Sequence, residues 1–321
     1  MICTRTMKKT AVLFPGQGSQ YLGMGKAFAE ADSEAAAIMD MAESISGFPL
    51  RRLSYDGPLE ELTRVLYLQP ALTAVNLICW QQLCKRLPGW QPRFAAGHSL
   101  GEYSALYAAG VLSLQDTLAL VTRRGELMER EGERHPGGMV AVLGLDLAAV
   151  EDLLAANERE GVAVVANHNT AQQIVLSGDS AGLAAAGALC KEKGGKIIPL
   201  KVSVANHSPL VAGAVPDFAE SMGKTDFQAP KVPVFFNVSA GLEHNPARIR
   251  ELMAYQIASK VRWLEIVEAM LVDGVEVFVE LGPKNVLTGM VKKILPKGSE
   301  TVCLQADTPE GLDEVARVIA S

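Results

Sequence analysis

A chain of 321 residues with 49% hydrophobic content can bury a large core, which fits one large domain or a large domain with a small one. The formal net charge of −6 and the lack of a basic stripe argue against a nucleic-acid partner, and no apolar run is long enough to span a bilayer. The five cysteines form no C-x-x-C pair and are odd in number, so neither a zinc site nor a disulfide framework is indicated.

The N-terminal segment predicts a short strand that ends in a glycine-rich turn. Its apolar stretch is too short before Pro15 for a signal peptide, and no small-residue cleavage site follows, so we expect a cytoplasmic protein. The turn at 14–20 reads FPGQGSQ, contains no G-K-[ST], and fails the G-x-G-x-x-G spacing because Tyr21 stands at the third glycine position. It therefore does not predict a nucleotide site. Such a turn can instead direct main-chain N–H groups at the oxyanion that forms when a carbonyl is attacked.

The segment 94–107 predicts a strand, a tight turn and a helix. A short apolar run precedes the frame Gly97-His98-Ser99-Leu100-Gly101, and a helical pattern follows it. This G-x-S-x-G frame is typical of a serine nucleophile, because the glycines permit a strained turn and the hydroxyl lies at the positive end of the helix dipole. The same frame occurs by chance in many chains, so an ordinary turn is the alternative. We expect Ser99 to be a nucleophile.

The helix predicted at 114–131 carries a candidate substrate-binding residue. Its apolar positions fall on one face at 3.6 residues per turn, and Arg124 flanks that face beside Val121 and Met128, whereas Arg123 projects away from it. We expect Arg124 to point inward, where its planar guanidinium could hold a carboxylate with two hydrogen bonds. The alternative is a structural ion pair with a nearby glutamate.

The pattern between residues 135 and 204 predicts a small subdomain inserted into the larger fold. Its elements alternate in a β-α-β-β-α-β order, which is the signature of a ferredoxin-like unit. The expected ranges are 137–143, 147–160, 162–166, 173–177, 180–193 and 196–202. We expect the fold class α/β, with an α/β-hydrolase-like core that contains a parallel sheet. That core would comprise 7–134 and 205–300, followed by a C-terminal tail at 301–321.

A serine nucleophile needs a base to take its proton, and the chain has five histidines. His98 adjoins Ser99 and would have to fold back over the turn, while His135 and His244 lie in polar loops where solvated histidines are expected. His168 and His207 both end a Val-Ala-Asn-His tetrapeptide that follows a predicted strand. The residues alone leave the choice between these two open.

The chain resembles the malonyl-CoA:acyl-carrier-protein transacylase family. The matching stretches span nearly the whole chain in the family's order. They are FPGQGSQ at 14–20, QPAL at 69–72, GHSLGEYSAL at 97–106, RRGELM at 123–128, VSVANHSPL at 202–210, YQIASKVRW at 255–263 and ELGPKNVLTG at 280–289.

The resemblance implies a role for each candidate site residue. His207, rather than His168, occupies the position of the family's base, oriented mainly by main-chain groups in a Ser–His dyad. The N–H groups of Gln17 and Leu100 are implied as the oxyanion hole. Arg124 would hold the free carboxylate of malonate. The expected substrate-binding residues are Arg124, Gln256, Met128 and Asn206. Without the family, Gln256 would be taken for a solvated helix residue.

The resemblance also implies an activity and its partners. We expect malonyl transfer from malonyl-CoA to the phosphopantetheine thiol of acyl carrier protein, for fatty acid biosynthesis, without a metal or other cofactor. The chain would act as a monomer, without a membrane or nucleic-acid partner. The alternatives are a free-standing acyltransferase of a polyketide pathway, a serine esterase or related hydrolase, and a non-enzymatic protein that retains the fold.

Two positions depart from the family's pattern. Lys284-Asn285 stand where a Gly-Lys pair is common. Asn206 stands where many malonyl-selective relatives place a phenylalanine whose bulk would exclude an α-methyl branch, although Leu100 is the malonyl-type residue. Because one methyl group in a pocket is worth about 1–3 kcal/mol, we expect only a modest preference, roughly 10–200-fold, for malonyl over methylmalonyl.

Overall fold

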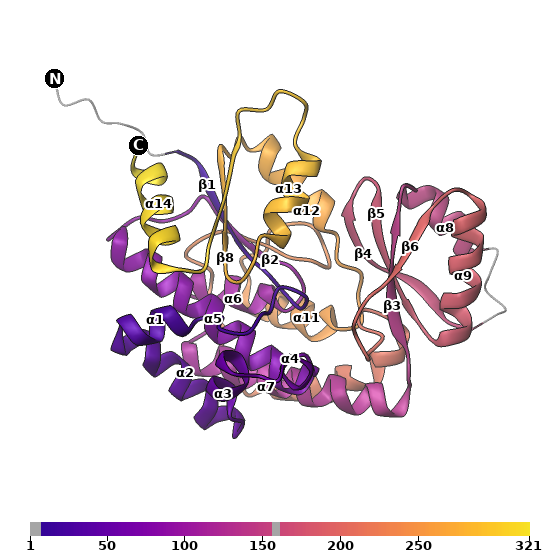
Figure 1. The fold of residues 1–321 in the computed structure, drawn as a ribbon, viewed down its shortest axis with the longest axis horizontal. Coiled ribbons are helices and arrows are strands. Elements are labelled where there is room, and N and C mark those ends of the chain that lie inside the picture. Colours follow the sequence, from indigo (N-terminus) through magenta and orange to yellow (C-terminus); the bar gives the residue numbers. More distant parts are fainter. Residues whose placement is uncertain (1–7, 156–160) are drawn as a thin grey trace.

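A five-stranded sheet organises the larger part of the computed structural model, which describes residues 8–155 and 161–321 (Figure 1). Its strand order is β7-β2-β1-β8-β9, and every neighbouring pair is parallel. All five residues of the central strand β1 are buried because helices cover both faces of the sheet. The strands are β1 (Thr10–Phe14), β2 (Phe94–Gly97), β7 (Val234–Phe235), β8 (Val277–Leu281) and β9 (Val302–Ala306).

The helices of this larger body divide between the two faces. Val12 and Phe14 of β1 belong to a large apolar cluster with α2, α5, α7 and α14, whereas Ala11 and Leu13 pack in a second cluster with α12 and α13. The helices are α1 (Lys26–Ala31), α2 (Ser33–Ser46), α3 (Leu50–Tyr55), α4 (Leu59–Leu62), α5 (Val65–Arg86), α6 (Gly101–Ala108), α7 (Leu114–Arg134), the 3₁₀ helix η1 (Pro209–Ala214), α10 (Val215–Gly223), α11 (Pro246–Gln256), α12 (Trp263–Val272), α13 (Val286–Ile294) and α14 (Pro309–Ala320).

A separate four-stranded sheet lies beside the larger body (Figure 1). Its order is β4-β5-β3-β6 with antiparallel pairs throughout, which is the ferredoxin-like arrangement that the sequence predicts. One face packs on its two helices through Val142, Ile174 and Leu176. The elements are β3 (Gly138–Leu143), α8 (Leu147–Ala155), β4 (Ala163–Thr170), β5 (Gln173–Gly178), α9 (Ser180–Glu192) and β6 (Lys196–Pro199). The predicted fold class, a parallel α/β core with a small inserted unit, is confirmed.

Two strands differ from the sequence prediction by more than one residue at an end. The strand expected at 162–166 runs on to Thr170, because its polar residues still pair with β5 through two irregularities. The strand expected at 196–202 ends at Pro199, opposite Val140 near the start of β3, and one further main-chain bond joins the Leu200 N–H to the Met139 carbonyl. The last residues of the helix expected at 147–160 lie outside the described residues.

The C-terminal segment is part of the core. Residues 301–321, which the sequence analysis sets apart as a tail, form β9 and α14. β9 pairs with β8 at the edge of the parallel sheet, and Leu312, Val315 and Ile319 of α14 are buried against the large apolar cluster. The stretch that precedes this segment is polar, so the sequence pattern gives no indication that the segment packs on the core.

The second face of the small sheet is turned toward the larger body. A loop of the larger body pairs with the edge strand β4, where the Val261 N–H donates to the Ala166 carbonyl and the His168 N–H donates to the Val261 carbonyl, both at 2.8 Å.

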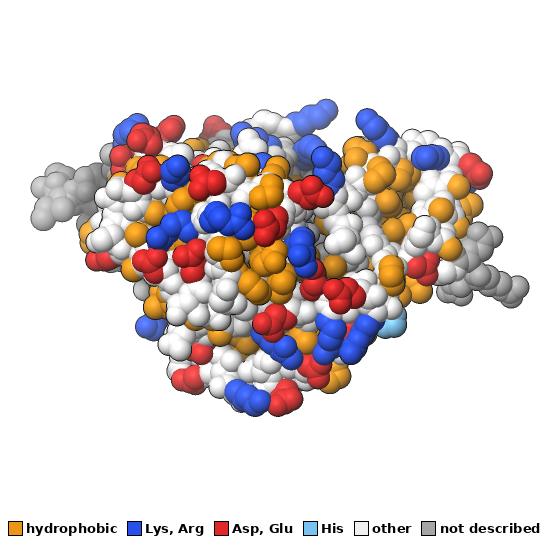
Figure 2. All heavy atoms as spheres, turned by 60° about the horizontal axis from the view of Figure 1, so that its bottom comes forward, with side chains coloured by type: hydrophobic (Ala, Val, Ile, Leu, Met, Phe, Trp, Pro, Cys, Tyr) orange, Lys and Arg blue, Asp and Glu red, His pale blue; other side chains and the backbone are white. Residues whose placement is uncertain are grey.

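In Figure 2, basic and acidic side chains are mixed over the face that comes forward. In the described parts of the chain, no helix is long and apolar enough to cross a membrane.

Candidate active site

Ser99 lies in a strained turn between β2 and α6. Its backbone is left-handed, with φ of 52°, and the flanking glycines allow the turn to pack tightly. A Cβ at Gly97 would come within 1.9 Å of the Gly101 carbonyl carbon, and a Cβ at Gly101 within 2.0 Å of the Phe14 carbonyl oxygen. No other residue fits at either position, so the G-x-S-x-G frame is a steric requirement of this turn.

His207 contacts the serine hydroxyl directly. The Ser99 Oγ lies 2.6 Å from His207 Nε2, and the other ring nitrogen, Nδ1, lies 3.0 Å from the Gln256 carbonyl oxygen and 2.9 Å from that of Ser259. Because two carbonyls can only accept, Nδ1 carries the proton and Nε2 is left to accept the serine proton. Burial, with the nearby Arg124 and His98, lowers the pKa of His207 to about 3, so its ring is neutral.

None of the other four histidines contacts the serine hydroxyl. His168 lies within β4, near Glu265 and Lys260, and does not line the pocket that contains Ser99. The His98 Nε2 lies 2.8 Å from the Asn169 Oδ1, and its ring stacks edge-on against Trp263. The side chains expected in polar loops, His135 and His244, are exposed. Tertiary structure thus separates the two Val-Ala-Asn-His segments, which local sequence could not do.

Arg124 is buried beside the serine without a carboxylate partner. Only 2% of it is exposed, and it donates to the Oε1 of Gln69 at 2.9 Å, to the Oε1 of Gln256 at 3.1 Å and to the Ser99 Oγ at 3.3 Å. Among the described residues no acidic side chain lies within ion-pair distance of it, and its Nε has no partner. The structural ion pair considered for this arginine is not observed. Burial lowers the pKa of Arg124.

Two main-chain N–H groups near Ser99 are available to an incoming group. Gly16 packs against the serine turn so closely that a Cβ there would lie 2.4 Å from the His98 carbonyl oxygen. This contact brings the Gln17 N–H to the same pocket as the Leu100 N–H, and neither donates to another described residue. The Ser99 N–H is already bound to the Asn237 Oδ1 at 2.7 Å. The N–H groups of Gln17 and Leu100, which the resemblance implies as the oxyanion hole, thus belong to two pocket residues and have no partner among the described residues.

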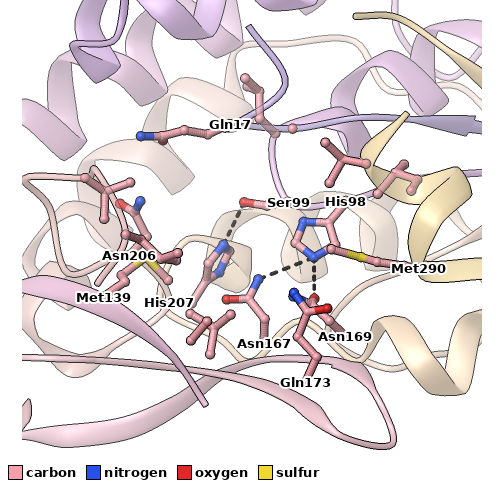
Figure 3. A pocket seen from close by; sticks show the side chains of 18 of the residues that line it. Gln17, His98, Ser99, Met139, Asn167, Asn169, Gln173, Asn206, His207 and Met290 are labelled. Carbon is pink, nitrogen blue, oxygen red and sulfur yellow. Dashed lines mark hydrogen bonds between the residues drawn. The ribbon is translucent and has the colours of Figure 1, made fainter. Parts of the chain in front are cut away.

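The pocket around these groups lies between the two sheets (Figure 3). It encloses about 890 Å³ including its open mouth. The larger body supplies the reactive groups, the buried Met128, and Asn206, whose Oδ1 has no hydrogen-bond partner. Alternate residues of the small sheet form the opposite wall, and α13 contributes apolar side chains. These wall residues are Met139, Ala141, Asn167, Asn169, Gln173 and Val175, with Val286, Leu287 and Met290 from α13.

Gln256 is buried, not solvated, and connects the site. It is 1% exposed at the end of α11, and its Nε2 donates to the Ser99 carbonyl at 2.7 Å and to the Glu102 Oε2 at 2.9 Å. Three buried polar residues around it were not found from the sequence: Gln69, Glu102 and Asn237. Glu102 carries the one usable signal, because it is the only charged residue of α6 and lies three residues after Ser99.

The geometry supports acyl transfer through the serine. The Ser99 hydroxyl is hydrogen-bonded to a neutral imidazole, and an arginine without an acidic partner lies 3.3 Å from the same hydroxyl. Two residues of the pocket, Gln17 and Leu100, have N–H groups without a described partner. This is the set of groups that transfer of a carboxylate-bearing acyl group requires. Within 8–155 and 161–321 no group of three or more His, Cys, Asp or Glu side chains could hold a metal ion.

Comparisons with known proteins agree with this chemistry. Residues 12–309 match the family model of the acyl transferase domain. The malonyl CoA-acyl carrier protein transacylase of Bacillus subtilis is 41% identical over 90% of this chain and 91% of its own length. The solved structure of the corresponding transacylase from Coxiella burnetii has a TM-score of 0.93 at 32% identity and covers 98% of this chain and 99% of that one. A malonyl-transacylase solved in complex with a type II PKS acyl-carrier protein has a TM-score of 0.91 at 33% identity, covering 96% and 99%.

Proposed function

Because this chain belongs to the acyl transferase family, and within it to the malonyl-CoA–acyl carrier protein transacylases, we propose that it transfers malonyl groups through Ser99. The donor is malonyl-CoA and the acceptor is the phosphopantetheine thiol of acyl carrier protein. The observation that carries this proposal is the unpaired Arg124 guanidinium, which lies 3.3 Å from the Oγ of the serine that is paired with His207.

The first half-reaction places malonate on the serine. The Ser99 Oγ attacks the thioester carbonyl carbon while its proton passes to His207 Nε2, and the resulting oxyanion accepts hydrogen bonds from Gln17 and Leu100. When the carbon–sulfur bond breaks, the imidazolium returns its proton to the sulfur, and coenzyme A leaves as the thiol. The carbonyls of Gln256 and Ser259 stabilise the imidazolium less than a carboxylate would.

The second half-reaction reverses these steps. The carrier thiol loses its proton to His207 and attacks the malonyl-serine ester, and the Ser99 oxygen leaves with the proton held by the histidine. Arg124 binds the malonyl carboxylate throughout, with Met128 and Asn206 beside the acyl group. Each step uses only side chains and main-chain groups of the protein, and we expect it to need no cofactor.

Three finer assignments are part of this proposal. We assign the enzyme to fatty acid biosynthesis, as a cytoplasmic monomer. One of the similar solved structures is a complex with a type II PKS acyl-carrier protein, so a polyketide carrier is the second candidate acceptor.

A modest selectivity for malonyl over methylmalonyl is also part of the proposal. Asn206 leaves room for a methyl branch, so Asn206→Phe should sharpen this preference. Competition between the two CoA esters measures this preference, and a wild-type ratio beyond about a thousandfold would contradict it.

Intact-mass measurement tests the proposed function. After mixing with malonyl-CoA, wild-type protein should gain the mass of one malonyl group, and Ser99→Ala should gain none. Adding holo carrier protein should move that mass to the carrier, whereas apo carrier protein, which lacks the thiol, should leave it on the enzyme. Release of free malonate without carrier loading would indicate a hydrolase, and an adduct on Ser99→Ala would remove the nucleophile assignment.

A further inference from the structure

One buried carboxylate at the site has no part in the mechanism above. Glu102 lies in the first turn of α6 and is fully buried. Its Oε1 accepts the Asn237 N–H at 2.9 Å, and its Oε2 accepts the Gln256 Nε2 at 2.9 Å. No lysine or arginine lies within ion-pair distance of it among the described residues. Burying a carboxylate without a paired cation is costly, and burial raises the pKa of Glu102 to about 7.

The hydrogen-bond partners of Glu102 indicate why a carboxylate is buried at this position. The Gln256 side chain makes contacts on both of its ends: its NH₂ group faces the Glu102 carboxylate and the Ser99 carbonyl, and its oxygen faces Arg124. A flipped amide would bring its NH₂ group against the guanidinium and its oxygen against two acceptors. Both Glu102 oxygens accept in the structure, and the Ser99 carbonyl accepts from the same NH₂ group, so these contacts favour one orientation of the amide.

The other oxygen of Glu102 acts on the nucleophile turn. It holds the main chain of Asn237, whose side chain binds both ends of the turn: the Oδ1 accepts the Ser99 N–H and the Nδ2 donates to the Gly97 carbonyl, each at 2.7 Å. One carboxylate thus contacts the residue that presents Arg124 and the residue that holds the strained serine.

We propose that Glu102 is a positioning residue that fixes the Gln256 amide so that Arg124 is presented to the carboxylate of the acyl group. This inference rests on the proposed function, because it assigns Arg124 the malonyl carboxylate. Glu102 does not line the pocket. It acts through an amide, and its negative charge lies one side chain away from the buried arginine.

The variant Glu102→Gln tests this inference because it keeps the shape and changes one acceptor into a donor. A glutamine presents an oxygen to only one of Asn237 and Gln256, so the Gln256 amide should lose one of the two acceptors that orient it toward Arg124. We expect kcat/KM for malonyl transfer to fall roughly tenfold or more, mainly through KM, with a much smaller fall for acetyl transfer. The malonyl-to-acetyl ratio is the readout, because a general loss of stability lowers both.

A double-mutant cycle tests whether Glu102 acts through Gln256. In a Gln256→Ala background, Glu102→Gln should change the malonyl-to-acetyl ratio by less than about twofold, because the residue through which it acts is gone. Glu131→Gln is the matched control. Glu131 is another buried carboxylate, on α7, but it pairs with Arg130 and Arg134. Replacing it should leave the malonyl-to-acetyl ratio unchanged.

Three outcomes would overturn the inference. These are an unchanged ratio in Glu102→Gln with a lowered melting temperature, equal ratio changes in Glu102→Gln and Glu131→Gln, and additive effects with Gln256→Ala. Malonyl loading of wild-type Ser99 is measured in the same experiment. Its absence would contradict the proposed function, whereas loading with any of the three outcomes would contradict the role of Glu102 alone.

Discussion

The two residues at the centre of the site both hold unfavourable backbone conformations. Ser99 and His207 have φ of 52° and 59°, and they are two of the four non-glycine residues with positive φ in the described chain. Such conformations cost on the order of 1–3 kcal/mol each and persist only where neighbouring bonds impose them. The Asn237 side chain holds the Ser99 N–H, and the Ile257 carbonyl holds that of His207. In these conformations the Ser99 Oγ lies 2.6 Å from the His207 Nε2.

The first prediction separates the two histidines of the repeated tetrapeptide. His207→Ala should slow acylation of Ser99 by about 10²–10⁴, the usual contribution of a general base. His168→Ala should leave the rate within about tenfold, because that ring lies in β4 away from the serine. Rapid-quench measurement of the acyl-enzyme gives both rates. Equal losses would mean that the base has been misassigned.

The second prediction concerns Arg124. Arg124→Ala should cost about 2–5 kcal/mol of transition-state stabilisation with malonyl-CoA, as expected for the loss of a desolvated charge partner. Acetyl-CoA has no carboxylate and should lose little or gain. The ratio of kcat/KM for the two donors is the measurement, with Arg123→Ala, on the exposed side of α7, as the control. A parallel fall for both donors would make Arg124 structural.

The third prediction is a pH profile. The pKa of His207 is lowered from 6.5 to about 3, so its base form persists as the pH falls. With acetyl-CoA, whose acyl group does not titrate, protonation of the imidazole should cause no fall in kcat/KM between pH 8 and about pH 5. Arg124→Ala removes a cation that opposes protonation of the ring, so its acidic limb should lie at higher pH. A wild-type limb near 6.5, unmoved in the variant, would contradict the electrostatics described here.

Sequence reasoning finds the residues whose neighbours along the chain carry the signal. Ser99 is marked by its glycines, and the helical period of 114–131 predicts the inward side of Arg124. The resemblance, not the residue pattern, selected His207. Gln69 and Asn237 were missed because each contacts the site from a distant part of the chain, and nothing beside them indicates it.

At the scale of elements, α13 shows how a pocket wall is fixed by a buried carboxylate that lies outside the helix. Its N-cap residue, Asn285, makes no side-chain cap. The buried Glu280 at the end of β8 accepts the N–H groups of Leu287 at 3.0 Å and Thr288 at 2.7 Å instead. The first turn of α13 in turn places Val286 and Leu287 in the pocket.

The fourth prediction follows from this cap. Glu280→Ala leaves two buried N–H groups without an acceptor and should cost about 0.5–2 kcal/mol, while Glu280→Gln keeps one acceptor and should cost less. Thermal unfolding ranks the variants, and KM for malonyl-CoA should rise with the loss of stability because α13 lines the pocket. If the two variants were equally stable, the cap would not contribute.

Elements were predictable where their pattern is local. The strands β1 and β2 end at glycine turns, and the β-α-β-β-α-β order of the small sheet follows from its alternating elements. The extension of β4 was not predictable, since Asn-His-Asn-Thr has no apolar alternation. β9 was not predictable either, because it is only partly buried until its last residue and depends on pairing with β8.

At the scale of the whole molecule, the pocket exists only because two sheets face each other. The small sheet buries one face on its own helices and presents the other, with Met139 and Asn169, to the serine. The loop that follows Gln256 joins the two bodies: its Ser259 carbonyl accepts from His207, and its Val261 pairs with β4. A ligand in the pocket therefore contacts both bodies and the loop that connects them.

The fifth prediction is that a bound donor protects this connection. In Ser99→Ala, which cannot turn over, malonyl-CoA at about 100 times its Kd should slow amide exchange at His168 and Val261 by up to roughly 100-fold, because opening the junction would release the ligand. The Val302 amide, bound to the Glu276 carbonyl at the far edge of the parallel sheet, is the control and should be unaffected. Hydrogen exchange followed by mass spectrometry measures all three. Protection confined to peptides around the serine turn would mean that the small sheet does not close on the donor, and the acyl group would then have to be recognised by the larger body alone.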